Sequence, residues 1–385
     1  MHRDSDLVHL GRTSAAAVHA VNPPLVRAST VVFETLEQYR QSYQSRVFES
    51  SRYGRSGTVT AFELQEAMAR IANAETCIAT SSGLNAITAV LGAHAGPGKH
   101  ILVYDGVYGP TRIFCEQSLT TLGTRVSFFN DGAEARRLIN DDTSLVFIEV
   151  PSSLTMQMLD ITQVCAAAHE RCIPVACDST WGSPMYFNAH ALGIDISIHS
   201  ATKFINGHSD VILGLITGTY SALETTRQWC DRYGSHASPD ACWLTLRGLR
   251  TLAVRMPRHQ ASAIEVAQWL CRHPKVKCMM FPVLASDPGH ALWKRQFSGG
   301  AGPFTFELQP CNEAAFERFI NALKLFGLGT SWGGYESLVI PAIPYALRSV
   351  KTLPDEGRLV RLHIGLEHAP DLCADLAHAF DQMDE

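Results

Sequence analysis

Three short stretches of the sequence carry residue types that could serve one ligand. Ser81-Ser82-Gly83-Leu84 combines small residues with free backbone N–H groups at the predicted start of a helix, a setting that favours a phosphate. Asp178 ends the apolar run 173–177, and Ser200-Ala201-Thr202-Lys203 follows the apolar run 194–198. A lysine can form an imine with an aldehyde, and a carboxylate can keep a pyridine nitrogen protonated. The three stretches together favour a site for pyridoxal phosphate (PLP).

Each stretch alone has a simpler explanation. A Ser-Ser-Gly sequence is commonly a plain turn, an aspartate after a strand commonly caps a helix, and a Ser-x-Thr-Lys sequence is commonly a solvated loop. Their occurrence in this order favours the functional interpretation. The residues by themselves leave both explanations open.

The elements that must position these residues alternate along the chain. Apolar spacing predicts helices at 58–75, 84–91 and 164–172, separated by short apolar runs typical of buried strands. The predicted strands lie at 76–79, 101–104, 125–129, 145–150, 174–177 and 194–198. Short buried strands between helices indicate a mostly parallel sheet that is covered on both faces. In such a sheet, ligand groups gather at the carboxyl ends of the strands.

Length and pattern together predict two domains and an arm. A chain of 385 residues exceeds what a single core usually holds. The weak periodicity of residues 1–55 predicts an N-terminal arm that lies against another surface. Residues 56–250 are predicted to form the large domain, which contains the candidate site. Beyond residue 250 the pattern changes to helices at 256–271, 313–323 and 371–382, with a strand at 304–308, which predicts a small domain over 251–385.

Composition excludes several classes of protein. A net charge of −5 with 46% hydrophobic residues is typical of an ordinary globular protein, and no basic patch suggests nucleic-acid binding. The 11 scattered cysteines, without a C-x-x-C pair, favour buried thiols over a disulfide or zinc framework, so no metal site is expected. No segment has the apolar length of a membrane span or a signal peptide. We therefore expect a cytoplasmic protein.

Motifs along almost the whole chain resemble one family. The stretch from Asp178-Ser179-Thr180-Trp181 to Lys203-Phe204 and Gly207-His208-Ser209-Asp210 resembles the cofactor-lysine region of the Cys/Met-metabolism PLP enzymes, which have fold type I. Further similar motifs are Asn22-Pro23-Pro24, Arg52-Tyr53-Gly54-Arg55, 246–252, 331–338 and 361–367. The resemblance implies an α/β fold with a mostly parallel seven-stranded sheet between helices, a smaller α/β C-terminal domain and an N-terminal arm.

The resemblance also implies roles for individual residues. Lys203 would carry PLP as a Schiff base and shuttle protons, Asp178 would pair with the pyridine nitrogen, and Tyr108 would stack on the cofactor ring. Lys203, Tyr108, Asp178 and Tyr53 are thus the candidate catalytic residues. The candidate cofactor-binding residues are Lys203, Asp178, Tyr108, Gly83, Leu84, Ser200 and Thr202, joined by Tyr53 and Arg55 from a neighbouring subunit. The candidate substrate-binding residues are Arg361, Ser331 and Trp332. A shared site requires at least a homodimer, and the family resemblance extends this to a homotetramer.

The expected activity is that of a carbon–sulfur lyase. Trp332 in Ser331-Trp332-Gly333-Gly334 is most similar to cystathionine β-lyases of the bacterial type, which implies β-elimination of cystathionine or a related cysteine S-conjugate. The products would be homocysteine, pyruvate and ammonia, a transsulfuration step of methionine biosynthesis. Ser56 stands where these lyases commonly have a second arginine, and Val150, Ser179 and Trp243 also depart from the pattern. A γ-lyase or γ-replacement enzyme is therefore the alternative.

Other interpretations remain for single residues and for the whole chain. Tyr108 and Trp332 could be core aromatics, Arg361 could form a surface ion pair, and Tyr53 with Arg55 could be a solvated turn. A nicotinamide oxidoreductase would suit the alternating pattern, but no G-x-G-x-x-G follows the first strand. A binding protein that has lost its activity is disfavoured by the intact lysine, aspartate and arginine.

Overall fold

The computed structural model describes residues 3–343, 348 and 358–384. Its centre is a seven-stranded sheet in the order β1-β7-β6-β5-β4-β2-β3. All neighbouring strands pair in parallel except β7, which is antiparallel to both β1 and β6. The strands are β1 Thr76–Thr80, β2 His100–Tyr104, β3 Arg125–Phe129, β4 Thr143–Glu149, β5 Val175–Asp178, β6 Ile196–Ser200 and β7 Gly214–Gly218. The mostly parallel seven-stranded sheet expected from the sequence is confirmed.

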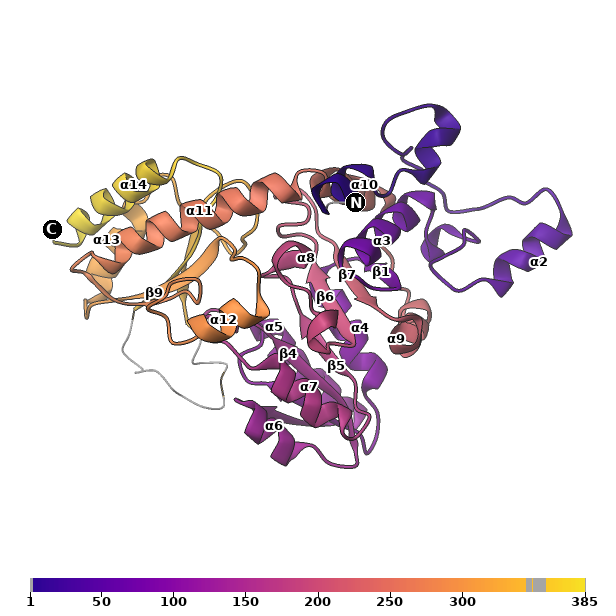
Figure 1. Ribbon diagram of the computed structural model, residues 1–385, viewed down its shortest axis with the longest axis horizontal. Coiled ribbons are helices and arrows are strands. Elements are labelled where there is room, and N and C mark those ends of the chain that lie inside the picture. The colour runs from indigo at the N-terminus through magenta and orange to yellow at the C-terminus, as the bar shows by residue number, and fades with distance from the viewer. Residues whose placement is uncertain (1–2, 344–347, 349–357, 385) are drawn as a thin grey trace.

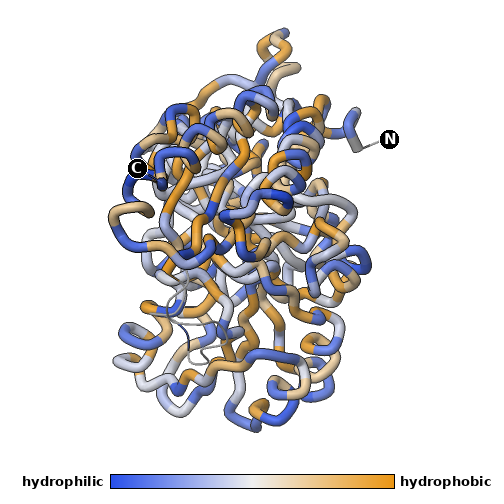
Figure 2. Tube along the Cα trace, turned by 90° about the vertical axis from the view of Figure 1, so that its left-hand side faces the viewer, coloured by the Kyte–Doolittle hydropathy of each residue, from blue (hydrophilic) through white to orange (hydrophobic). Residues whose placement is uncertain are grey.

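Helices cover this sheet, and its strands are largely buried except for the edge strand β3 (Figure 1). Every residue of β1, β2, β5 and β7 is buried, which explains why these strands are continuous apolar runs rather than alternating ones. In Figure 2 hydrophobic segments run through the interior of the molecule and hydrophilic ones gather in the outer turns. The covering helices are α3 Val59–Ile71, α4 Gly83–His94, α5 Gly109–Ile113, α6 Gly132–Leu138, α7 Ile161–His169, α8 Ser183–Tyr186, α9 Tyr220–Arg232 and α10 Pro239–Leu249.

A second, smaller sheet follows in the C-terminal part of the chain. It has five strands in the order β10-β11-β12-β9-β8. These are β8 Val276–Met280, β9 Pro303–Leu308, β10 Gly327–Leu328, β11 Leu338–Ala342 and β12 Leu359–His363. Its helices are α11 Leu252–Cys271, α12 His290–Gln296, α13 Glu313–Ala322 and α14 Ala369–Asp381, and Figure 1 shows α11, α13 and α14 together beside it. The start of α11 agrees with a boundary near 250, although the division into domains stays a prediction.

The N-terminal segment is held to the body at its start and extends away from it afterwards. Arg250 donates hydrogen bonds to the carbonyls of Leu7 and Leu10, which anchors α1 Arg3–His9. The helix α2 Leu36–Gln44 projects from the rest of the molecule in Figure 1. Its segment carries large exposed side chains, Val32 being 88% exposed. An N-terminal arm over 1–55 stays a prediction.

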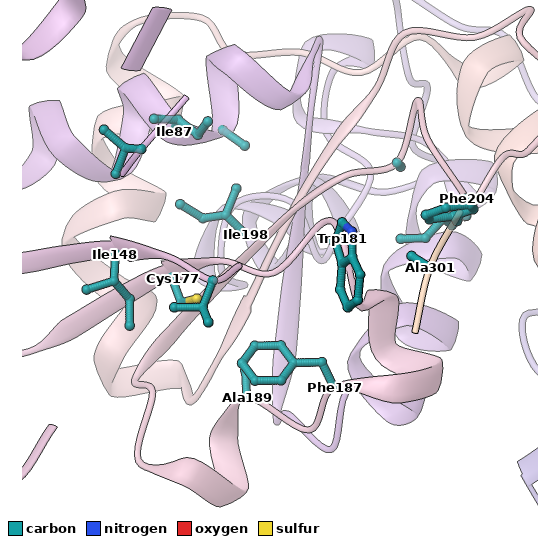
Figure 3. Packing of buried hydrophobic residues seen from close by; sticks show 14 of the residues in the cluster. Ile87, Ile148, Cys177, Trp181, Phe187, Ala189, Ile198, Phe204 and Ala301 are labelled. Carbon is teal, nitrogen blue, oxygen red and sulfur yellow. The ribbon is translucent and has the colours of Figure 1, made fainter. Parts of the chain in front are cut away.

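The core fixes the strand ends at which the candidate site lies. Figure 3 shows Ile148 of β4, Cys177 of β5 and Ile198 of β6 packed in the buried cluster, each next to or near the last residue of its strand. Trp181 donates a hydrogen bond to the carbonyl of Pro303 in β9, at 3.2 Å. This contact joins the loop after β5 to the second sheet. Side chains at these strand ends therefore have little freedom to move.

No helix in the described part of the chain is long and apolar enough to cross a membrane.

Candidate active site

A cavity of about 410 Å³ lies where the carboxyl ends of the central strands approach the second sheet. Most of the residues singled out from the sequence line it. These are Gly83, Leu84, Tyr108, Asp178, Ser200, Thr202, Lys203, Trp332 and Arg361. Ser331 lies at its edge in contact with Lys203. Residues that are far apart in the sequence thus come together, as the order of the strands requires.

Lys203 lies in the turn that follows β6. Its amine donates a hydrogen bond to Ser331 Oγ at 2.7 Å and lies 5.3 Å from the centre of the Trp332 ring. Burial, assisted by the positive charge of Arg361 and opposed by Asp178, lowers the pKa of Lys203 from 10.5 to about 8. An amine with a pKa this close to neutrality can act as a nucleophile and as a general base.

Asp178 is the last residue of β5 and is buried. Its Oδ1 accepts hydrogen bonds from the backbone N–H of Thr180 at 3.0 Å and from the Thr180 hydroxyl at 2.5 Å. Burial raises the pKa of Asp178, while the Thr180 hydrogen bonds and the charge of Lys203 oppose that rise. The Thr180 hydroxyl also accepts from the N–H of Ser200, so one side chain joins the ends of β5 and β6.

The N-terminus of α4 offers a place for an anion. Ser82 caps the helix by accepting from the N–H of Asn85, and the amides of Gly83 and Leu84 have no hydrogen-bond partner among the described residues. A Cβ atom on Gly83 would lie 2.6 Å from the Ser200 side chain, so only glycine lets the helix approach the loop after β6 this closely. The hydroxyl of Thr202 is already bonded to the backbone of Leu213.

Arg361 reaches the cavity from β12 in the second sheet. It is buried, and its Nη2 donates to the carbonyl of Ser331 at 2.7 Å. Its Nε has no partner and none of the described carboxylates pairs with it, which argues against a surface ion pair. Burial lowers the pKa of Arg361 to about 10. A buried guanidinium that still has a free donor suits the carboxylate of a ligand.

Tyr53 and Arg55 do not line the cavity of their own chain. Tyr53 is half-exposed, and Arg55 forms an ion pair with Asp231 at 2.7 Å. The structure of one chain therefore does not bring these two residues to the other candidates. Their expected role, which depends on a neighbouring subunit, stays a prediction.

Two residues that the sequence analysis missed hold the site together. Thr180 stands two residues after Asp178, a spacing at which an aspartate oxygen commonly accepts the backbone N–H, and this local signal was available. Arg255 of α11 donates to the carbonyls of Phe204 at 2.7 Å and Gly248 at 2.9 Å, and so fixes the turn that carries Lys203. Nothing in the sequence linked Arg255 to that turn, because the contact spans 51 residues.

These residues fit PLP on the evidence of their own geometry. The amides and the close Gly83–Ser200 contact make a cradle for the phosphate, Lys203 supplies a partly neutral amine, and Asp178 supplies a buried carboxyl. A lysine, a carboxylate and a helix N-terminus at the carboxyl edge of a mostly parallel sheet define the class of fold-type-I PLP enzymes.

Comparison with known proteins agrees with this class. Residues 4–381 match the Cys/Met metabolism PLP-dependent enzyme family, and the chain belongs to that family. It is 38% identical over 389 residues to a cystathionine beta-lyase of Salmonella typhimurium, covering 99% of this chain and 98% of that one. It is 39% identical to a cystathionine beta-lyase of Bordetella avium, with the same coverage. The crystal structure of cystathionine gamma-lyase from Lactobacillus plantarum complexed with L-serine matches with a TM-score of 0.91 and 30% identity, over the whole of both chains.

The lowered pKa of Lys203 predicts a pH-dependent effect on stability in the cofactor-free protein. Burying the charged amine costs free energy below pH 8, and this cost disappears as the pH rises to 10.5, where the lysine is neutral in both states. Lys203→Met should thus be more stable than the wild type by about 3 kcal/mol at pH 7, and the difference should shrink toward pH 10.5. Urea denaturation of both proteins across this range measures it. A difference independent of pH would contradict the lowered pKa.

Proposed function

We propose that this enzyme cleaves the carbon–sulfur bond of cystathionine, or of a related cysteine S-conjugate, by β-elimination. The observation that carries the proposal is the approach of Lys203 to Ser331 and Trp332 in a cavity that also holds Asp178 and Arg361. The proposal is supported by 38% and 39% identity, over nearly the full length, to two proteins named cystathionine beta-lyase.

The residues of the chain have distinct tasks in this proposal. When bound, PLP withdraws electrons from the Cα of an amino acid held at its aldehyde carbon. Arg361 binds the α-carboxylate of the substrate and orients the Cα–H bond toward Lys203. Lys203 Nζ then removes the α-proton, which a lysine with a pKa of about 8 can do. Asp178 keeps its negative charge beside the ring nitrogen and so keeps that nitrogen protonated.

The overall reaction balances with one water. Cleavage of the Cβ–S bond releases a thiolate, which takes a proton to become homocysteine when the substrate is cystathionine. Lys203, which carries the abstracted proton, is a donor for that step. The remaining three-carbon fragment reacts with water to give pyruvate and ammonia. No electrons are gained or lost from outside, so no oxidant or reductant is needed.

A γ-lyase or γ-replacement enzyme is the second candidate. Ser56 stands where cystathionine β-lyases commonly have a second arginine. Among the described lining residues, the only cations are Lys203 and Arg361, so a distal carboxylate of the substrate meets no further positive charge within this set. The similarity to the cystathionine gamma-lyase of Lactobacillus plantarum also supports this candidate.

The keto acid that is released distinguishes the two candidates. We expect cystathionine to give pyruvate, whereas γ-elimination would give 2-oxobutyrate. The assay offers cystathionine, cystine and methionine to the PLP-loaded enzyme and separates the two keto acids by chromatography. Release of 2-oxobutyrate as the main product would overturn the β-lyase proposal.

The charge of Asp178 should be essential. Asp178→Ala leaves the ring nitrogen without its buried partner, a loss of about 3 to 5 kcal/mol, so it should bind PLP poorly and lose most turnover. Asp178→Asn is the matched variant, because its amide oxygen can still accept both Thr180 hydrogen bonds although it carries no charge. We expect it to keep the fold and to lose turnover as well. Turnover equal to the wild type in either variant would exclude the assigned role.

We also propose that the active enzyme is a homo-oligomer, a tetramer assembled from dimers, in which Tyr53 and Arg55 contact the cofactor phosphate of a neighbouring subunit. The exposed apolar side chains of the arm support this proposal, because surfaces of that kind are normally covered by a partner. The enzyme would act in the cytoplasm, in the transsulfuration step of methionine biosynthesis.

Mixing two inactive variants tests whether the site is shared. A chain with Arg55→Ala keeps Lys203, and a chain with Lys203→Ala keeps Arg55. If Arg55 serves the neighbouring subunit, a hybrid dimer has one intact site, and random pairing restores about a quarter of the wild-type activity. If Arg55 serves its own chain, no hybrid contains an intact site and activity stays at the level of the separate variants. Activity is measured after the two proteins are unfolded together and refolded.

A further inference from the structure

Glu149 is a carboxyl group of the cavity to which neither the sequence motifs nor the proposed mechanism gives a task. It is the last residue of β4 and stands in register with Asp178, the last residue of β5. Its side chain lines the cavity together with Asp178 and Tyr108. Two carboxyl groups therefore lie side by side at the edge where the cofactor binds.

The contact that Glu149 makes is with the backbone of Tyr108. The N–H of Tyr108 donates to Glu149 Oε2 at 2.6 Å. Tyr108 is the residue before α5, and the loop leading to it is also held by a hydrogen bond from the N–H of Ser153 to the carbonyl of Gly106 at 2.8 Å. Tyr108 is 44% exposed in the chain, so the packing around its side chain is incomplete. Glu149 is the side chain that ties this residue to the sheet.

The two carboxyl groups have different surroundings. Asp178 receives two hydrogen bonds from Thr180 and faces the Lys203 amine, both of which favour its ionised form. Burial, and then the charge of Asp178, raise the pKa of Glu149 well above its usual range, although the Tyr108 amide and Arg348 oppose the rise. One oxygen of a protonated carboxyl group still accepts a hydrogen bond, so the contact with Tyr108 needs no charge.

We propose that Glu149 is a positioning residue for the reaction: its carboxyl oxygen accepts the backbone N–H of Tyr108, and thereby keeps the phenol ring in place over the cofactor. The inference rests on the proposed function in one respect, the role of Tyr108 at the cofactor ring. In this proposal Glu149 takes no part in the making or breaking of bonds. It acts through Tyr108 alone.

Two near-isosteric variants separate the acceptor from the charge. Glu149→Gln keeps an oxygen that can accept from the Tyr108 N–H and removes any charge. Glu149→Met fills a similar volume but has no such acceptor, so it leaves the amide without its partner. We expect Glu149→Gln to keep kcat/KM and PLP affinity within about twofold of the wild type, and Glu149→Met to lower both by about tenfold. PLP affinity is measured by titrating the cofactor-free protein, and thermal unfolding shows whether each variant is folded.

Combining these variants with Tyr108→Ala tests the route of the effect. Tyr108→Ala removes the ring but keeps the backbone N–H, so the hydrogen bond to Glu149 survives. If Glu149 acts through the position of the ring, Glu149→Met should change kcat/KM and PLP affinity by less than about twofold in the Tyr108→Ala background. The circular dichroism of the bound cofactor should likewise change with Glu149→Met only when the tyrosine ring is present.

Two results would overturn the inference. Equal loss in Glu149→Gln and Glu149→Met would show that the charge matters, and the same loss with and without the Tyr108 ring would show that Glu149 does not act through it. Should the wild-type enzyme release no keto acid from any sulfur amino acid, the proposed function fails by itself. PLP affinity and circular dichroism then still decide the role of Glu149.

Discussion

The site depends on keeping one lysine amine out of water beside a buried carboxylate. A fully hydrated lysine would be protonated at neutral pH and would be a poor base, so the amine of Lys203 has to be desolvated to do chemistry. Ser331 and Trp332 pack against the amine and exclude water from it. The free-energy cost of desolvation is partly offset by the negative charge of Asp178, which ends the neighbouring strand. The lysine is thus usable because two separate sheets close around it.

This requirement explains why the cavity is built from both parts of the chain. The central sheet supplies Asp178, Lys203 and the N-terminus of α4, whereas β12 and the loop before β11 supply Arg361 and Trp332. Arg255 of α11 and the Trp181–Pro303 contact connect the two parts next to the lysine turn. A change in how the two sheets pack would therefore alter the solvent access of the amine.

The sequence predicted the central sheet well because its strands are short, buried and apolar, and it predicted Lys203, Asp178 and the α4 amides as one group because they end such strands. It did not predict β7, whose Gly-Leu-Ile-Thr-Gly run has no flanking pattern, or that this strand runs antiparallel.

Among the residues that hold the site, Thr180 could have been found from its spacing to Asp178. Arg255 and Glu149 could not have been found in this way, because each contacts an element that lies far away in the sequence. The sequence also could not tell Arg361 from Arg358, which lies three residues before it. Arg361 is buried, whereas Arg358 pairs with Glu313 at the surface.

The antiparallel strand β7 lies between β1 and β6 and begins at the edge of the sheet where those two strands end. Two strand spacings, or about 10 Å, separate β1 from β6 within the sheet. The residues that follow them nevertheless meet, because a Cβ atom on Gly83 would lie 3.0 Å from the Cα of Ser200. Gly214 begins β7 in register with both Thr80 and Ser200, and a Cβ atom there would lie 2.2 Å from the carbonyl oxygen of Ser82. The absence of a side chain at the start of β7 therefore lets the loop after β1 lie directly against this strand. A larger residue at position 214 would push the N-terminus of α4 away from the loop that carries Lys203.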